Sequence, residues 1–177
     1  ILAFHPTQHG LTDHRYKVVA NIPYYLTSRL IRTILEQWPQ PELIVLTLQK
    51  EVARRICAKP PHMNLLALSV QYYAEPTIVA MVSRGSFRPT PKVDSAIILL
   101  TPRLAHGEKA RTAPLFELVR LGFSSKRKQL ASTLSGGLGI GRMLVQQALQ
   151  TISLPATARP ENLSLQQWER LLGILKS

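Results

Sequence analysis

The sequence predicts an α/β domain that is followed by a small all-helical domain. Short apolar runs alternate with segments of helical periodicity over the first part of the chain. An order of strand, helix, strand, helix is typical of a sheet whose parallel strands are joined by right-handed crossovers. Beyond a polar stretch, only helical periodicity remains. We therefore expect the α/β domain over residues 1–103, a linker over 104–111 and the helical domain over 112–177.

The predicted sheet begins with a strand at 17–21. A helix follows, which we expect Thr27 or Ser28 to cap and two prolines to end near Trp38. Residues 43–48 are continuously apolar, which is the pattern of a strand buried on both faces. Further helices are expected over 49–56 and 64–74, and further strands over 77–82 and 94–101, the last antiparallel to its neighbour.

The helical domain is predicted to contain four helices. They are expected over 114–123, from near Ser125, over 142–150 and after Ser164. The last helix carries the Ser-x-x-Gln pattern of a capping box. Four glycines within 136–141 predict a flexible connector between the second and third helices, since the stretch lacks the lysine of a phosphate-binding loop.

The stretch Val-Val-Ala-Asn-Ile-Pro-Tyr-Tyr at 18–25 is the first candidate site. β-Branched residues favour a strand, and Asn-x-Pro ends it. Asn21 is therefore expected at the carboxyl end of a strand, where open α/β sheets bind ligands. Asn21 offers an acceptor and a donor, Pro23 is expected to leave its carbonyl free, and Tyr24 offers a flat face. These groups suit a planar heterocycle with an amine, although a strand-ending turn with packed tyrosines is the simpler interpretation.

The net charge of +12 favours a polyanionic partner, most often nucleic acid. The only cysteine, Cys57, excludes an internal disulfide and metal sites built on several cysteines, and we expect no metal. No apolar run is long enough to span a bilayer, so no membrane partner is expected. Basic residues gather in three clusters, which are our candidates for binding RNA unless they form solvated faces: Arg54, Arg55, Arg84, Arg88, Lys92, Lys126, Arg127 and Lys128.

Five motifs occur in an order that resembles one known family. They are Asn-Ile-Pro-Tyr at 21–24, Leu-Gln-Lys-Glu-Val at 48–52, Phe-Arg-Pro-Thr-Pro-Lys-Val-Asp-Ser at 87–95, Phe-x-x-Lys-Arg-Lys-x-Leu at 123–130 and Pro-Glu-Asn-Leu-Ser at 160–164. The chain resembles the ribosomal RNA adenine dimethyltransferases of the KsgA-like branch, to which the erythromycin-resistance methyltransferases are related. The resemblance covers nearly the whole chain.

This resemblance implies the C-terminal part of a Rossmann-like class I methyltransferase sheet with a helical domain after it. It implies S-adenosylmethionine as donor, and the N6 amine of adenines in small-subunit ribosomal RNA as acceptor, methylated twice. Asn21 and the Pro23 carbonyl would hold the amine, while Tyr24 and Phe87 would enclose the flipped base. Asn21, Ile22 and Pro23 would also contact the donor. A monomer in the cytoplasm is expected.

The chain departs from the family in two places. Residues 64–67, Asn-Leu-Leu-Ala, stand where the family usually has a Tyr-Gly pair before Leu-Ser-Val, which bears on local packing only. The second departure is larger. The family's glycine-rich donor loop and its acidic donor-binding residues would all precede Ile1, so we expect the numbered chain to be a fragment. A second hypothesis is a non-catalytic RNA-binding or ribosome-assembly factor with the same fold, which the retained Asn21, Pro23, Tyr24 and Phe87 disfavour. A DNA adenine methyltransferase is a third, disfavoured by the Phe87 loop and the helical tail.

Overall fold

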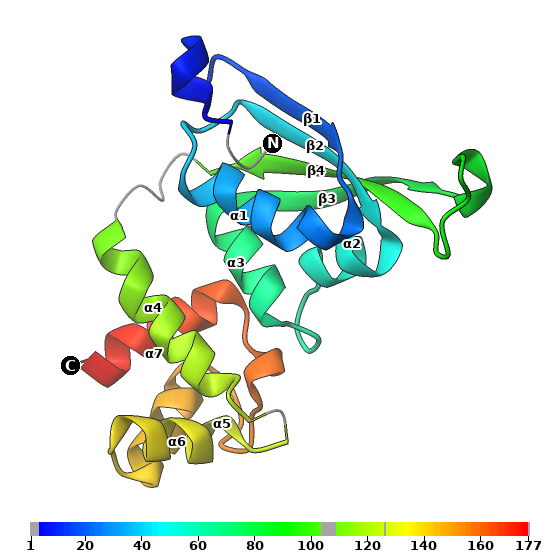
Figure 1. The fold of residues 1–177 in the computed structure, drawn as a ribbon. Coiled ribbons are helices and arrows are strands. Elements are labelled where there is room, and N and C mark those ends of the chain that lie inside the picture. Colours follow the sequence, from blue (N-terminus) through cyan, green and yellow to red (C-terminus); the bar gives the residue numbers. More distant parts are fainter. Residues whose placement is uncertain (1–3, 104–108, 126, 177) are drawn as a thin grey trace. The chain divides into compact units, whose positions relative to one another are not determined.

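The computed structural model describes residues 4–103, 109–125 and 127–176 (Figure 1). Its described residues form two compact units. We call residues 4–57 and 69–103 the α/β unit, and residues 58–68, 109–125 and 127–176 the helical unit. The domain division predicted around 104–111 falls partly outside the described residues and stays a prediction. No helix in the described ranges is both long and apolar enough to cross a membrane.

The α/β unit contains one four-stranded sheet in the order β1, β2, β4, β3. Its strands are β1 (Lys17–Asn21), β2 (Leu43–Gln49), β3 (Ala74–Val82) and β4 (Ser95–Pro102). β1 pairs with β2 in parallel, and β4 pairs antiparallel with both β2 and β3. These pairings confirm the predicted parallel pair and the returning antiparallel strand. The carboxyl ends of β1, β2 and β3 consequently share one edge of the sheet.

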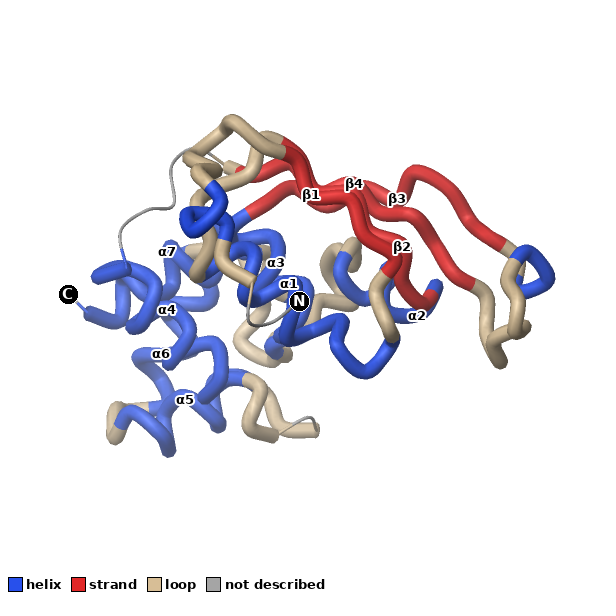
Figure 2. Tube along the Cα trace, turned by 45° about the horizontal axis from the view of Figure 1, so that its top comes forward, coloured by secondary structure: helices blue, strands red, loops and turns tan. Residues whose placement is uncertain are grey.

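The helices α1 (Thr27–Glu36) and α2 (Lys50–Ile56) lie on one face of this sheet (Figure 2). Ile44, Leu46 and Leu48 of β2 are fully buried on that face. The alternate residues of the same strand are only half-buried. The prediction that 43–48 is buried on both faces is therefore wrong, because the residues of β2 that face away from α1 and α2 remain partly exposed.

Helix α1 begins differently from the prediction. No side chain caps it, and the buried Thr27 is its first helical residue. A short 3₁₀ turn, Tyr24–Leu26, precedes it, and Leu26 already has right-handed helical angles (φ −96°, ψ −12°). Because the chain enters the helix from a turn that is already helical, no polar N-cap is needed at Thr27 or Ser28. The helix ends at Glu36, shortly before Trp38.

The helical unit contains α4 (Lys109–Gly122), α5 (Leu130–Leu138), α6 (Arg142–Thr151) and α7 (Leu165–Lys176). The helix α3 (Leu65–Tyr73) begins in this unit and ends in the α/β unit. Trp168, Leu130 and Leu134 are fully buried and form the centre of the helical core. The predicted capping box is confirmed: the Gln167 N–H donates to Ser164 Oγ at 3.3 Å, and the Ser164 N–H donates to Gln167 Oε1 at 2.9 Å.

Two predicted helix starts are wrong. Helix α4 begins at Lys109 rather than at Pro114, and Pro114 lies inside it. Helix α5 begins at Leu130 rather than near Ser125, and a turn closed by the Lys128 N–H and the Ser125 carbonyl (3.3 Å) precedes it. Cations in the first turn of a helix oppose its dipole, so a start after the Lys-Arg-Lys run is more favourable.

The predicted glycine connector is shorter than expected. Gly136 and Gly137 lie within α5, and only residues 139–141 separate α5 from α6. A Cβ atom on Gly137 would lie 2.8 Å from Leu121 Cγ, so this glycine permits close packing of α5 against α4. Gly139 ends α5 with a φ of +68°, a left-handed angle that glycine adopts at low cost.

We predict that Gly122→Ala destabilises the helical unit and that Gly136→Ala does not. A Cβ on Gly122 would overlap the buried Trp168 ring and lie 2.9 Å from Leu130 Cδ1. Such overpacking costs about 1–3 kcal/mol. A Cβ on Gly136 meets nothing within 4 Å, and alanine in a helix is favoured by about 1 kcal/mol. Urea unfolding measures both variants, and equal midpoints would contradict the packing at Gly122.

Candidate functional site

The carboxyl end of β1 presents the Asn-Ile-Pro segment at the shared edge of the sheet. Asn21 is the last residue of β1 and is exposed, and its side chain has no hydrogen-bond partner in the described chain. Ile22 is buried and its N–H donates to the Thr47 carbonyl at 3.1 Å. This hydrogen bond fixes the end of β1 against β2, while the side-chain amide of Asn21 has no partner among the described residues. Ile22 was also predicted to contact the methyl donor. Because its side chain is buried and its N–H is already used, a polar contact with that molecule would have to use the Ile22 carbonyl oxygen.

Pro23 is exposed, but its carbonyl is not free as the sequence led us to expect. It accepts a hydrogen bond from the Leu26 N–H at 2.9 Å, which closes the 3₁₀ turn before α1. A carbonyl oxygen has two lone pairs, so one acceptor position remains. The stacking role predicted for Tyr24 concerns a side chain outside the described part of the structure. The neighbouring Tyr25 is strongly exposed.

Phe87 lies in the loop between β3 and β4, and Figure 1 shows this loop projecting beyond the ends of β1 and β2. Its side chain is half-buried. The loop contains a 3₁₀ turn, Arg84–Ser86, which Ser83 caps by accepting from the Gly85 N–H at 3.3 Å. The Arg88 guanidinium donates to the Phe87 carbonyl at 3.1 Å and to the Gly85 carbonyl at 3.3 Å. Arg88 is thus partly committed to holding the loop.

Asp94 joins this loop to the β2–α2 junction. Its Oδ1 accepts from the Arg84 N–H at 3.2 Å, and its Oδ2 lies 3.5 Å from Lys50 Nζ. The backbone N–H of Lys50 also donates to the Asp94 carbonyl at 3.0 Å. The Arg84 N–H is the largest cause that lowers the pKa of Asp94; desolvation opposes it, and Lys50 lowers the pKa further. The contacts of the ionised Asp94 carboxylate therefore stabilise the folded state at pH values above the ordinary aspartate pKa. This stabilisation is lost as acidification protonates the carboxyl in the folded protein.

A cavity of about 380 Å³ lies beside Asp94, and we call it the basic pocket. It is formed by the end of β2, the first turns of α2 and the β3–β4 loop. Three of the predicted RNA-binding residues, Arg54, Arg84 and Lys92, come together in its walls. Arg55 and Arg88 do not line it. The lining residues are Gln49, Lys50, Glu51, Arg54, Arg84, Lys92, Val93 and Asp94.

The third predicted basic cluster belongs to the helical unit. Arg127 and Lys128 are exposed in the turn before α5. Lys126 lies outside the described residues. The structure therefore places Arg127 and Lys128 on a solvated surface, and their predicted contact with RNA stays a prediction.

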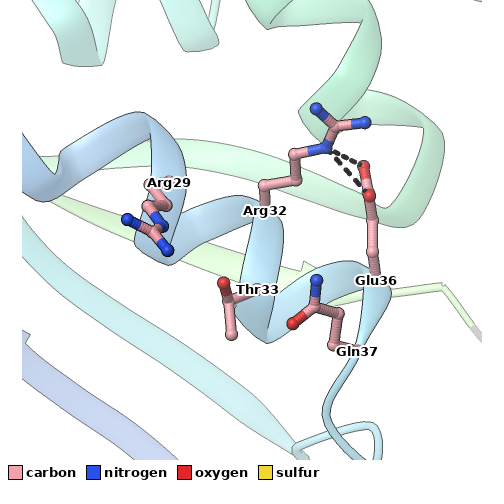
Figure 3. Close-up of a pocket in the computed structure, with 5 residues that line it drawn as sticks. All are labelled: Arg29, Arg32, Thr33, Glu36 and Gln37. Carbon is pink, nitrogen blue, oxygen red and sulfur yellow. Dashed lines mark hydrogen bonds and ion pairs between the residues drawn. The ribbon is translucent and has the colours of Figure 1, made fainter. Parts of the chain in front are cut away.

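A second hollow, of about 290 Å³, lies along the exposed face of α1 (Figure 3). Arg32 Nε donates to both carboxylate oxygens of Glu36, at 3.0 and 2.9 Å. This pair leaves Arg29 as the cation of the hollow that has no ion-pair partner among the described residues. All lining residues come from one helix and its C-cap, so no second wall converges on a ligand. It is the weaker candidate of the two.

Sequence reasoning missed the residues that organise the site. Lys50 and Asp94 were part of matched motifs, but neither was assigned a role. Their contact joins residues 44 positions apart, and no local pattern shows such a pairing. Ser83 alone offered a local signal for the structured loop, because a serine before a short polar segment often caps a helical turn.

We predict that Asp94→Ala loosens the Phe87 loop more than Asp94→Asn does. Alanine removes both the acceptor for the Arg84 N–H and the charge that faces Lys50, whereas asparagine can keep the acceptor. Hydrogen exchange of the Arg84 amide at neutral pH should be fastest in Asp94→Ala and intermediate in Asp94→Asn. Lys50→Gln, which removes the ion pair alone, should resemble Asp94→Asn. Unchanged exchange in Asp94→Ala would contradict this organisation of the loop.

Comparisons with known proteins agree with the motifs and with the fold. A family model described as ribosomal RNA adenine dimethylase matches residues 5–176. The ribosomal RNA small subunit methyltransferase A of Dehalococcoides mccartyi (strain CBDB1) is 41% identical over 160 residues, covering 90% of this chain and 55% of that protein. The protein of the same name from Crocosphaera subtropica is 43% identical over 159 residues, and the match covers 86% of this chain and 58% of that protein. The chain spans a little over half the length of these relatives.

Two solved structures share the fold. The 23S rRNA methyltransferase ErmE matches with a TM-score of 0.79 and 27% identity, covering 99% of this chain and 69% of that chain. A dimethyladenosine transferase from Plasmodium falciparum matches with a TM-score of 0.73 and 26% identity, covering 88% and 65%. The predicted fold class, a Rossmann-like α/β sheet with helices after it, is confirmed, as is the family resemblance. The chain belongs to the ribosomal RNA adenine dimethylase family.

Proposed function

We propose that this chain carries the adenine-binding side of an rRNA adenine N6,N6-dimethyltransferase that acts on small-subunit ribosomal RNA. The observation that carries the proposal is the exposed Asn21 side chain, which has no hydrogen-bond partner in the described residues and stands at the end of β1. The same sheet edge carries the Phe87 loop and the basic pocket. An amine acceptor, an aromatic residue and cations are what a flipped adenine on an RNA strand requires.

The chemistry follows from the low basicity of the adenine amine, whose lone pair is delocalised into the ring. Asn21 Oδ1 and the second lone pair of the Pro23 carbonyl accept its two N–H groups. The two N–H groups become stronger donors to these oxygens as positive charge develops on the amine nitrogen, so the hydrogen bonds strengthen in the transition state and lower the barrier. Phe87 covers the ring, and the anchored Ile22 holds the segment in place. The reaction needs no general base before methyl transfer.

S-adenosylmethionine is the donor that we propose, and when bound it supplies an electrophilic methyl group on a sulfonium. The exposed, uncharged amide of Asn21 and the exposed Pro23 fit the methyl-bearing end of this molecule, because neither brings a competing nucleophile. Within this chain, donor contacts are proposed only for Asn21, Ile22 and Pro23. A donor held there would face the amine acceptors directly.

RNA is the partner that best explains the charge. Arg54, Arg84 and Lys92 line one pocket, and we propose that Arg55, Arg88, Lys126, Arg127 and Lys128 add contacts to the RNA backbone. A cytoplasmic monomer that works on the small ribosomal subunit is the setting we infer. The alternative, an RNA-binding assembly factor without transferase activity, has the same basic pocket in its favour. It offers no reason for an exposed Asn21 side-chain amide beside Pro23 that has no hydrogen-bond partner among the described residues.

We predict that Asn21→Ala abolishes adenine discrimination while general RNA affinity is kept. The probes are a short oligouridine with one adenine and the same strand with purine, which lacks the amine. The wild-type chain should prefer adenine by about fivefold, the worth of one to two hydrogen bonds. Asn21→Ala should lose that preference, and it should lower methyl transfer strongly in an assay with the donor. Gln37→Ala, which removes an exposed amide at the C-cap of α1, is the matched control. If Asn21→Ala lowered the affinity for the adenine strand and for the purine strand equally, that result would contradict the assigned role.

Donor binding is tested separately by a calorimetric titration of the chain with S-adenosylmethionine. We expect weak binding, because only the Asn21–Pro23 segment is proposed to contact the donor and Ile22 can offer only its carbonyl oxygen. Tight one-to-one binding would show that other residues of this chain hold the donor. In that case the chain should be assayed directly as a methyltransferase.

A further inference from the structure

The basic pocket differs from an ordinary basic surface in how it is built. Its walls come from the β2–α2 junction and from the β3–β4 loop, which are distant in sequence. Asp94 holds these walls together through the Lys50 backbone N–H at 3.0 Å, Lys50 Nζ at 3.5 Å and the Arg84 N–H at 3.2 Å. The cavity therefore has a defined shape before any ligand binds.

The charges in the pocket leave a cationic excess. Four cations and two carboxylates line it, which gives a formal charge of +2. One of those carboxylates, Asp94, is already engaged by Lys50 and by the Arg84 N–H. Arg54 and Lys92 have no ion-pair partner in the described residues, and the Arg84 guanidinium acts on Asp94 only as a neighbouring charge. These cationic side chains of the pocket therefore favour an anionic ligand.

The position of the pocket indicates which anion. It lies at the carboxyl end of β2, next to β1, so it shares the sheet edge with Asn21. The Phe87 loop forms one of its walls, two strand spacings or about 10 Å across the sheet from β1. A strand that places an adenine at Asn21 and Phe87 therefore has this pocket on the same sheet edge as the adenine.

We propose that the basic pocket binds one backbone phosphate of the RNA strand, within a few nucleotides of the adenine held at Asn21. Arg54, Arg84 and Lys92 contact the phosphate, and the Asp94 contacts keep their walls at a fixed separation. This subsite rests on the proposed function for its ligand, since it takes RNA as the partner. It adds a registering contact that sets which nucleotide reaches Asn21.

The test removes the charge of one phosphate at a time. The strands are short oligouridines with a single adenine, in which one linkage at a time is a neutral methylphosphonate. For the wild-type chain, one linkage near the adenine should weaken binding by about three- to tenfold, and more than the other linkages do. The double variant, Arg84→Ala with Arg54→Ala, should make that linkage equivalent to the rest. It should also reduce the magnitude of the slope of log K against log salt by about 0.7, which is the loss of one single-strand phosphate contact.

Two features make the variants well matched. Arg84→Ala keeps the backbone N–H that donates to Asp94, so the loop itself should stay in place. Arg29→Ala is the control, since it removes the same charge from α1 of the same unit, does not line the basic pocket and is assigned no contact with RNA. It should leave the preferred linkage unchanged. Thermal unfolding of all variants verifies that each is folded.

The outcomes separate this proposal from the proposed function. Equal effects at every linkage, or a preferred linkage that survives in the double variant, would overturn the phosphate subsite even if adenine discrimination is seen. A preferred linkage without adenine discrimination would support the subsite and contradict the role of Asn21. Competition by inorganic phosphate as strong as by the RNA strand would mean a free-anion site instead.

Discussion

The position of β4 between β2 and β3 is the constraint on which the site depends. Because β4 runs antiparallel to both neighbours, the loop that precedes it emerges at the edge where β1 and β2 end. Ile98 and Leu100 of β4 are fully buried, as are Ile44 and Leu46 of β2, so this pairing is fixed by the core. A one-residue slip would turn these side chains to the opposite face. The apolar core of the sheet thereby sets the register of the functional edge.

On that edge, one residue anchors the backbone while its neighbour keeps an exposed polar side chain. Ile22 anchors the strand end by its side chain and N–H, while Asn21 beside it remains exposed. The Phe87 loop is held by its own turn and by Asp94, while Arg54 and Lys92 beside it keep no ion-pair partner among the described residues. Groups that are held in this way lose little conformational freedom when a ligand binds.

Elements with strong local patterns were predicted closely, and elements decided by packing were not. β1 was predicted with its observed bounds, and the Ser164 capping box was identified from four residues. The predicted cap at Thr27 or Ser28 was wrong because a preceding turn had already set helical angles. The predicted burial of 43–48 on both faces was wrong because periodicity shows that a strand is apolar, not what covers each face.

The sequence by itself determined the family, the order of the elements and the residue types at the site, because motifs and apolar periodicity are local properties of the chain. Only the tertiary structure decided that Arg54, Arg84 and Lys92 share one cavity while Arg55 and Arg88 stay outside it. It also showed the Pro23 carbonyl already accepting from Leu26. These facts depend on contacts between segments that are far apart in sequence, or on the exact path of a turn, and no local pattern encodes either.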